Sequence, residues 1–134
     1  MRADATQEHS ALNWVKKELD AVLNQARLAL ESYAEDAENQ EALREADESL
    51  RQVHGTLQMV ELYGAAMLTE EMQSVVDGLH RGQIGKRDEA LEVMMRAMLQ
   101  LPDYLEHVQA GHRDTPIVLL PMLNDLRSTR GEGL

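Results

Sequence analysis

Residues 43–60 read LREADESLRQVHGTLQMV, and this stretch decides the fold. Its apolar residues recur at steps of three and four, namely Leu43, Ala46, Leu50, Val53, Leu57 and Val60. That spacing lines one side of an α-helix, because the helix completes a turn every 3.6 residues. The stretch therefore predicts an amphipathic helix with one buried side, which follows a polar loop at 35–40 and reaches about Tyr63.

Four further segments show the same spacing, at residues 10–30, 65–80, 88–108 and 115–126. Alternation of apolar and polar residues, the pattern of a half-buried strand, is absent. Long amphipathic helices joined by short loops pack as antiparallel neighbours. We therefore expect an all-α fold, an antiparallel four-helix bundle with an additional C-terminal helix laid against it.

Capping residues predict where the helices begin and end. Ser10 suits the N-cap of the first helix. Thr115 followed by Pro116 is a good start for the last helix, because proline fits the first helical position. Pro102 is expected to kink the fourth helix or to end its first half. Three glycines are expected to break the pattern after the second, third and fifth helices, at Gly64, Gly82 and Gly131.

The length and composition are those of one globular domain. A chain of 134 residues can bury a substantial core, and its 43% hydrophobic and 28% charged residues give a globular balance. We expect a disordered leader at 1–9, a single helical-bundle domain at 10–131 and a tail at 132–134. No signal peptide is expected at the N-terminus, which fits a cytoplasmic protein.

Charge and cysteine content exclude several classes of function. The chain has no cysteine, which excludes disulfides and thiolate metal sites. Its formal net charge of −11 would repel nucleic acid and anionic membranes. Its longest apolar run, Ile117–Leu123, is too short to span a bilayer. Other proteins are the expected partners.

The negative charge is concentrated in the first 50 residues, which hold 12 acidic and 5 basic residues. A solvated helix face is the usual meaning of such a run. The alternative is a docking surface for a basic partner.

Motifs for catalysis, metal binding and nucleotide binding are missing from the sequence. The five histidines lack the spacing of a zinc site with supporting carboxylates. No serine has a nucleophile-elbow context, and there is no glycine-rich phosphate loop. We therefore expect no catalytic residue, no metal and no cofactor.

A glycine interrupts the strongest helical pattern in the chain. Gly55 stands in the middle of the predicted second helix, where glycine costs about 1 kcal/mol relative to alanine. Close helix packing is one reason for such a residue. Access is the other, because residues four apart share a helix face and the missing side chain would bare Arg51. The apolar stripe turns both residues outward and leaves His54 at its edge.

Residues 51–82 resemble the helix hairpin of histidine phosphotransfer domains, which pass a phosphoryl group between kinase and receiver. In that family an exposed histidine precedes a basic residue at plus three and glycine at plus four. Here the acceptor position falls on Arg51, and a guanidinium accepts no phosphoryl group. The resemblance implies a degenerate phosphotransfer site at Arg51, His54 and Gly55. The alternative is an active domain that phosphorylates His54, although Gln58 rather than glycine follows four residues later.

Three longer stretches carry a wider resemblance: VHGTLQMVELYGAA at 53–66, LQLPDYL at 99–105 and LLPMLNDLR at 119–127. They are similar to the N-terminal domain of ChpA-type (PilL) hybrid histidine kinases, which govern type IV pili, and to the N-terminal region of the FimL family. The resemblance implies a non-catalytic docking domain in a cytoplasmic twitching-motility system at the cell pole. It also implies a partner, the cytoplasmic helical-repeat domain of the scaffold protein FimV. Response regulators are the partners under the phosphotransfer alternative.

The last helix carries more apolar residues than one buried side needs. Ile117, Leu120 and Pro121 fall off its main stripe, so with Met122 they are our candidates for partner binding. Burial of both sides within the bundle is the equally weighted alternative. A second set, Met94, Met95 and Met98, could mediate self-association, but helical spacing favours the core for it.

Overall fold

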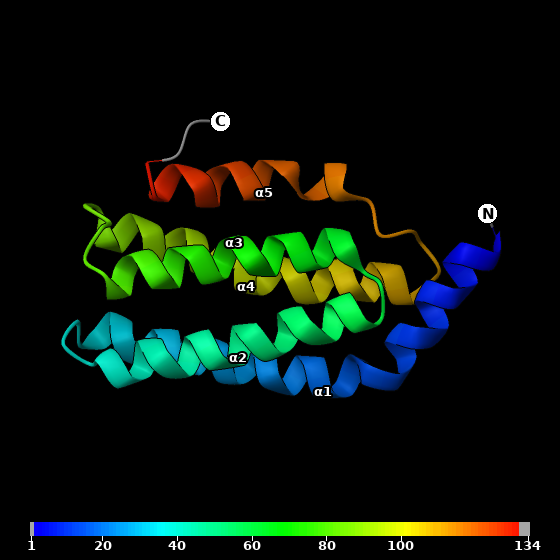
Figure 1. Cartoon of the computed structure of the whole chain (residues 1–134), viewed down its shortest axis with the longest axis horizontal. Helices are drawn as coiled ribbons and strands as arrows, with labels where there is room; N and C mark the ends of the chain where they lie inside the picture. Colours follow the sequence, from blue (N-terminus) through cyan, green and yellow to red (C-terminus); the bar gives the residue numbers. More distant parts are fainter. Residues whose placement is uncertain (1, 132–134) are drawn as a thin grey trace.

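The computed structural model describes the backbone of residues 2–131 and the side chains of residues 11–131. This part of the chain contains helices and no strand. The helices are α1 (Arg2–Glu35), α2 (Gln40–Met59), α3 (Tyr63–His80), α4 (Arg87–Gln109) and α5 (Pro116–Thr129). Short turns join them, as the all-α prediction requires (Figure 1).

The first four helices form an antiparallel bundle. α1 packs on α2 and α4, and α3 also packs on α2 and α4, so the four helices close a ring around one core (Figure 1). α5 lies on α3 and α4 and makes no contact with α1 or α2. The predicted four-helix bundle with an additional C-terminal helix is confirmed.

Leucine, valine, alanine and methionine fill the core, since the chain has no phenylalanine. The apolar stripe of α2 is buried from Leu43 to Leu57, as its spacing predicted. Met94 and Met98 are buried too, and Met95 is half-buried against them. The methionines of α4 therefore belong to the core and do not form a surface for self-association.

The turn between α2 and α3 lies earlier than predicted. α2 ends at Met59, and Glu61 takes a left-handed conformation with φ 64°. The N–H groups of Glu61 and Leu62 donate to the carbonyls of Gln58 and Leu57, which closes the end of α2. Gly64 is therefore no helix breaker, because it lies buried in the first turn of α3.

The other helix ends agree with their signals in part. Gly82 closes α3 in a left-handed conformation, and Thr115 and Pro116 open α5 as predicted. α4 continues through Pro102, so the proline does not end it. α1 begins at Arg2, so Ser10 lies within this helix and does not cap it.

The predicted division of the chain is not tested. Met1 and the tail at 132–134 lie outside the described residues, and only the backbone is described for the rest of the proposed leader. The boundaries at 9/10 and 131/132 therefore stay a prediction. None of the described helices has the length and hydrophobicity to cross a bilayer.

Candidate functional site

Three helices present their exposed sides on one face of the molecule. α2, α3 and α5 run side by side, with α3 in the middle (Figure 1). We call this surface the three-helix face. Five exposed or half-exposed residues of α3 form a central stripe along it, at steps of three and four residues: Tyr63, Met67, Glu70, Ser74 and Asp77. This stripe is apolar at the start of α3 and polar or acidic toward its end.

The polar half of the three-helix face contains an open hollow of about 570 Å³. Side chains of α2 and α3 form its walls, and Arg130 closes it from the end of α5. Asp47, Glu70 and Asp77 line it together with Arg51 and His54. This mixture of charges suits polar recognition of a partner.

Arg51 projects into solvent, as the stripe of α2 predicted. Its side chain is 70% exposed, and Nη2 donates to Asp47 Oδ2 at 2.9 Å. The hydrogen bond and the negative charge of Asp47 raise the pKa of Arg51 above its already high ordinary value. The guanidinium is therefore charged at every physiological pH and is no phosphoryl acceptor.

His54 lies at the edge of the stripe, also as predicted. Its side chain is 20% exposed, and Nε2 lies 3.7 Å from Glu70 Oε2. A phosphoryl group on this ring would place roughly two negative charges next to that carboxylate. The surroundings of His54 therefore oppose phosphorylation.

Gly55 has no packing reason to be glycine within the described chain. A Cβ built there meets nothing within 4 Å, and its φ is an ordinary helical angle. Close packing of helices, the first of the two reasons considered from the sequence, does not apply. Access to the outward side of α2 beside Arg51 is the reason that remains.

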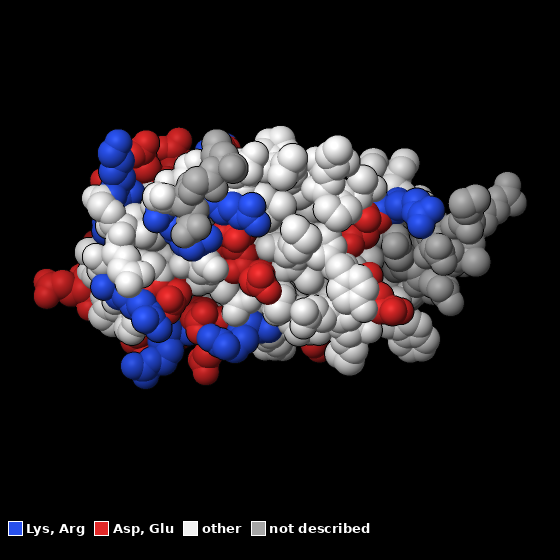
Figure 2. All heavy atoms as spheres, turned by 45° about the horizontal axis from the view of Figure 1, so that its top comes forward, with Lys and Arg blue, Asp and Glu red and all other residues white. Residues whose placement is uncertain are grey.

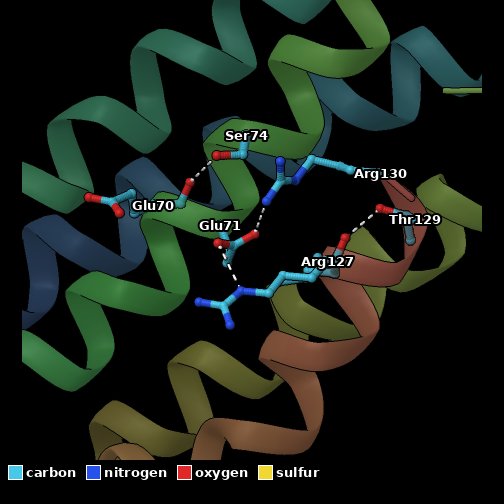
Figure 3. A network of polar contacts seen from close by, with 7 residues as sticks. Glu70, Glu71, Ser74, Arg127, Thr129 and Arg130 are labelled. Atoms are coloured by element: carbon cyan, nitrogen blue, oxygen red, sulfur yellow. Dashed lines mark hydrogen bonds and ion pairs between the residues drawn. The ribbon is translucent and has the colours of Figure 1, made fainter. Parts of the chain in front are cut away.

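An arginine pair fastens the end of α5 to α3, and sequence spacing gave no sign of it. Arg130 Nη2 donates to Glu71 Oε1 at 2.7 Å, and Arg127 Nε donates to Oε2 at 3.3 Å (Figure 3). The Glu71 side chain is only 13% exposed, so water screens these contacts little. The contacts link residues 56 and 59 positions apart, beyond the reach of any helical period.

A second cluster fastens the beginning of α5. The Asp114 carboxylate accepts hydrogen bonds from the N–H groups of Gly64 and Ala65 and from Tyr104 Oη. It thereby caps the first turn of α3, whose N-cap residue Leu62 offers no side-chain acceptor. Gly64 makes this approach feasible, because a Cβ there would lie 2.8 Å from Asp114 Oδ1.

The two clusters set α5 parallel to α3. Pro116 lies against Gly64 at the start of both helices, and Arg127 meets Glu71 farther along each. Leu120 and Met67 lie between these two contacts. Helical spacing places Leu120 on the same side of α5 as Arg127, so it borders α3 next to Met67.

The apolar half of the three-helix face occupies this region. Ile117 is 72%, Tyr63 58%, Leu120 45% and Met67 44% exposed. Figure 2 shows uncharged surface over the beginnings of α3 and α5, whereas charged groups gather toward their ends. We call Tyr63, Met67, Ile117, Leu120 and the exposed Pro121 the apolar surface.

Met122, one of the four contact residues predicted for α5, does not lie on the surface. Met122 is 7% exposed and belongs to the core, so it cannot serve as a surface contact. Val118, by contrast, is 56% exposed although it is not among the predicted contacts. The error arises because a short helix with apolar residues on most sides leaves its buried direction undefined.

Other conspicuous side chains lie away from this face. Trp14 is 89% exposed on α1. The rings of His107 and His112 stack with centroids 3.7 Å apart at the end of α4. Among the residues described, no three histidine, aspartate or glutamate side chains are grouped so that they could hold a metal ion.

Comparison with known proteins identifies the family. The sequence model of the FimL C-terminal domain matches residues 6–122, which is most of the chain. The chain belongs to the FimL C-terminal domain family. The scaffold protein FimL of Pseudomonas aeruginosa is 34% identical to it over 123 residues, which cover 92% of this chain and 22% of that protein. No solved structure matches this FimL-family domain.

The family assignment refines the resemblance found in the sequence. The stretches at 53–66, 99–105 and 119–127 suggested the N-terminal region of FimL, whereas the matching family is that of its C-terminal domain. The likeness to FimL itself is confirmed, and the assigned region is corrected. This FimL-family domain spans about a fifth of the relative's length, so it corresponds to one part of a scaffold protein.

Proposed function

We propose that this domain is a non-catalytic docking module whose contact area is the apolar surface of α3 and α5. The observation that carries the proposal is the exposure of Ile117, Leu120 and Met67, which helical spacing places on the same face of the molecule. Exposed apolar side chains that gather on one face mark protein-binding sites. The similarity of this domain to a scaffold protein supports the same role.

The partner we propose is the cytoplasmic helical-repeat domain of FimV, as the resemblance to type IV pilus signalling proteins implies. In this role the domain would hold a chemosensory system, including a ChpA-type histidine kinase, at the pole of the cell. The strongly acidic composition favours a partner with a basic surface, because opposite charges speed encounter and disfavour wrong partners.

Phosphotransfer through His54 is the alternative function, and its surroundings argue against it. Glu70 lies 3.7 Å from the ring, and the nearest arginine of α2, Arg51, is engaged by Asp47. A phosphoryl acceptor needs cationic or N–H groups that stabilise its charge. The domain therefore fits recognition better than transfer.

Calorimetric titration with the purified FimV cytoplasmic domain tests the docking proposal. We expect the wild-type domain to bind it, and Leu120→Asp to weaken binding at least about tenfold, because a charge would be buried at an apolar contact. Leu28→Asp is the matched control, since Leu28 is similarly exposed but lies on α1. No binding by the wild type, or equal losses in both variants, would refute the proposal.

Incubation with acetyl phosphate, or with the cognate kinase, tests the alternative. The docking proposal predicts no acid-labile phosphoryl group on the wild-type domain. A label that disappears in His54→Ala would instead establish phosphotransfer.

A further inference from the structure

We infer that the three-helix face binds one amphipathic helix of a partner protein. The side of that helix that contacts the face is apolar in one half and basic in the other. This inference rests on the docking function proposed above and states the chemistry of the partner. Helices commonly bind by laying apolar anchors into a groove between helices. Here the face is centred on α3, which lies between α2 and α5, and its polar half contains the hollow described above (Figure 1).

The central stripe of α3 sets the length and the direction of the site. α3 has 18 residues, so a bound helix of the same length would cover about 27 Å. The stripe changes from Tyr63 and Met67 to Glu70 and Asp77 within that length. A ligand that matches the whole stripe must therefore change character at its midpoint.

The apolar half supplies the anchoring contacts. Helical spacing places Met67 and Leu120 on the facing sides of α3 and α5, and each is nearly half exposed. Two aliphatic residues of a partner, one turn apart, could cover both side chains together with Tyr63. Burial of such central apolar residues provides most of the affinity in protein interfaces.

The acidic half supplies the charge complementarity. Glu70 is 69% exposed, and among the described residues its carboxylate faces only His54. The two arginines at this hollow are already engaged, Arg51 by Asp47 and Arg130 by Glu71. A lysine or arginine of the partner would thus meet a carboxylate that lacks a permanent cationic neighbour (Figure 3).

Gly55 provides an independent sign that a partner approaches this side of α2. It weakens the helix, yet nothing in the described chain occupies the place of its side chain. The open position lies one turn after Arg51 and directly after His54, two residues that line the hollow. A second chain can approach the backbone closely there.

Fluorescence anisotropy with defined peptides tests the inference. The probe is an 18-residue helical peptide with leucines on one side of its first half and lysines on the same side of its second half. We expect it to bind the complete chain at least about tenfold more tightly than two controls. One control carries glutamates for lysines, and the other distributes the same leucines and lysines evenly along the helix.

Two pairs of variants locate the bound peptide. Glu70→Lys and Leu120→Asp should each weaken binding of the probe about tenfold or more. Glu92→Lys and Leu28→Asp introduce the same changes at exposed positions on α4 and α1, and should bind like the wild type. Equal affinity for the probe and the even-distribution control, or equal effects of the paired variants, would overturn the inference.

The peptide test is separate from the test with FimV. Tight peptide binding without binding of FimV would reject the proposed partner and keep the helix-binding face. Sedimentation that shows a dimer lost in Leu120→Asp would overturn the inference in another way, because a second copy would then cover the apolar surface.

Discussion

The helical glycines Gly64 and Gly55 have opposite surroundings. Gly64 admits the Asp114 carboxylate and Pro116, which would lie 2.8 and 3.1 Å from a Cβ at that position. Gly55 has open space where its side chain would be. The first glycine serves the fold of the domain, whereas the second weakens the fold without any benefit inside it.

The same substitution at these two positions should therefore change stability in opposite directions. Gly64→Ala should lower the free energy of unfolding by about 1–3 kcal/mol, because the added methyl group would clash with the Asp114 carboxylate. Hydrogen bonds to α3 and Tyr104 keep that carboxylate from moving aside. Gly55→Ala should raise it by about 1 kcal/mol through helix propensity alone. Urea unfolding measures both free energies. A loss of stability in Gly55→Ala would show that the space around residue 55 is not open.

Side-chain directions on α2 could be predicted from sequence because one long stripe defines them. The six-residue stripe of α2 turned Arg51 outward and placed His54 at its edge, and both lie there. The short stripe of α5 defines no such direction, so the buried Met122 was named as a surface contact and the exposed Val118 was missed. The contacts that Asp114 makes with α3 and Glu71 makes with α5 were unpredictable, since they join residues 49 to 59 positions apart and leave no periodic trace.

At the scale of elements, α5 is the helix on which the docking proposal depends. It contacts only α3 and α4 and is fastened at its start by Asp114 and at its end by Glu71. These contacts hold Ile117 and Leu120 beside Met67. Loosening either end would disturb the apolar surface without dismantling the four-helix bundle.

Glu71→Gln removes the charge that both arginines share while keeping the shape of the side chain. We expect it to lower the free energy of unfolding by about 1–2 kcal/mol, because Arg127 and Arg130 would keep only a weaker neutral acceptor. Amide hydrogen exchange should accelerate in the second half of α5 more than in α1 or α2.

Glu92→Gln is the control for this prediction, because Glu92 is an exposed acid on α4. It should leave both stability and exchange unchanged. Unaltered exchange in α5 of Glu71→Gln would mean that the arginine pair does not hold this helix.

The helices themselves were predictable from sequence, but their ends were less so. Strong apolar periodicity located all five of the described helices. The end of α2 was placed too late because Glu61, not a glycine, takes the left-handed conformation that closes the helix. Residues other than glycine seldom adopt this conformation, so sequence spacing gave no reason to expect it.

At the scale of the whole molecule, the net charge and the apolar surface have different roles in the proposed docking. The net charge of −11 favours encounters with basic groups, and in the proposed docking role the apolar surface would supply a localised contact. The sequence predicted the bundle and the exposure of Ile117, Leu120 and Pro121 in α5, whereas their role in docking stays a proposal. It could not predict that α3 joins them, because α3 and α5 meet only in the folded chain.

The central claim, that this domain docks through its three-helix face, can be tested by nuclear magnetic resonance on the 15.1 kDa chain. Titration of the isotope-labelled domain with the FimV cytoplasmic domain should shift or broaden amide signals around Met67, Glu70 and Leu120. Signals of α1, including those around Trp14, should stay unchanged. Changes centred on α1 or on the stacked His107 and His112 rings would contradict the account.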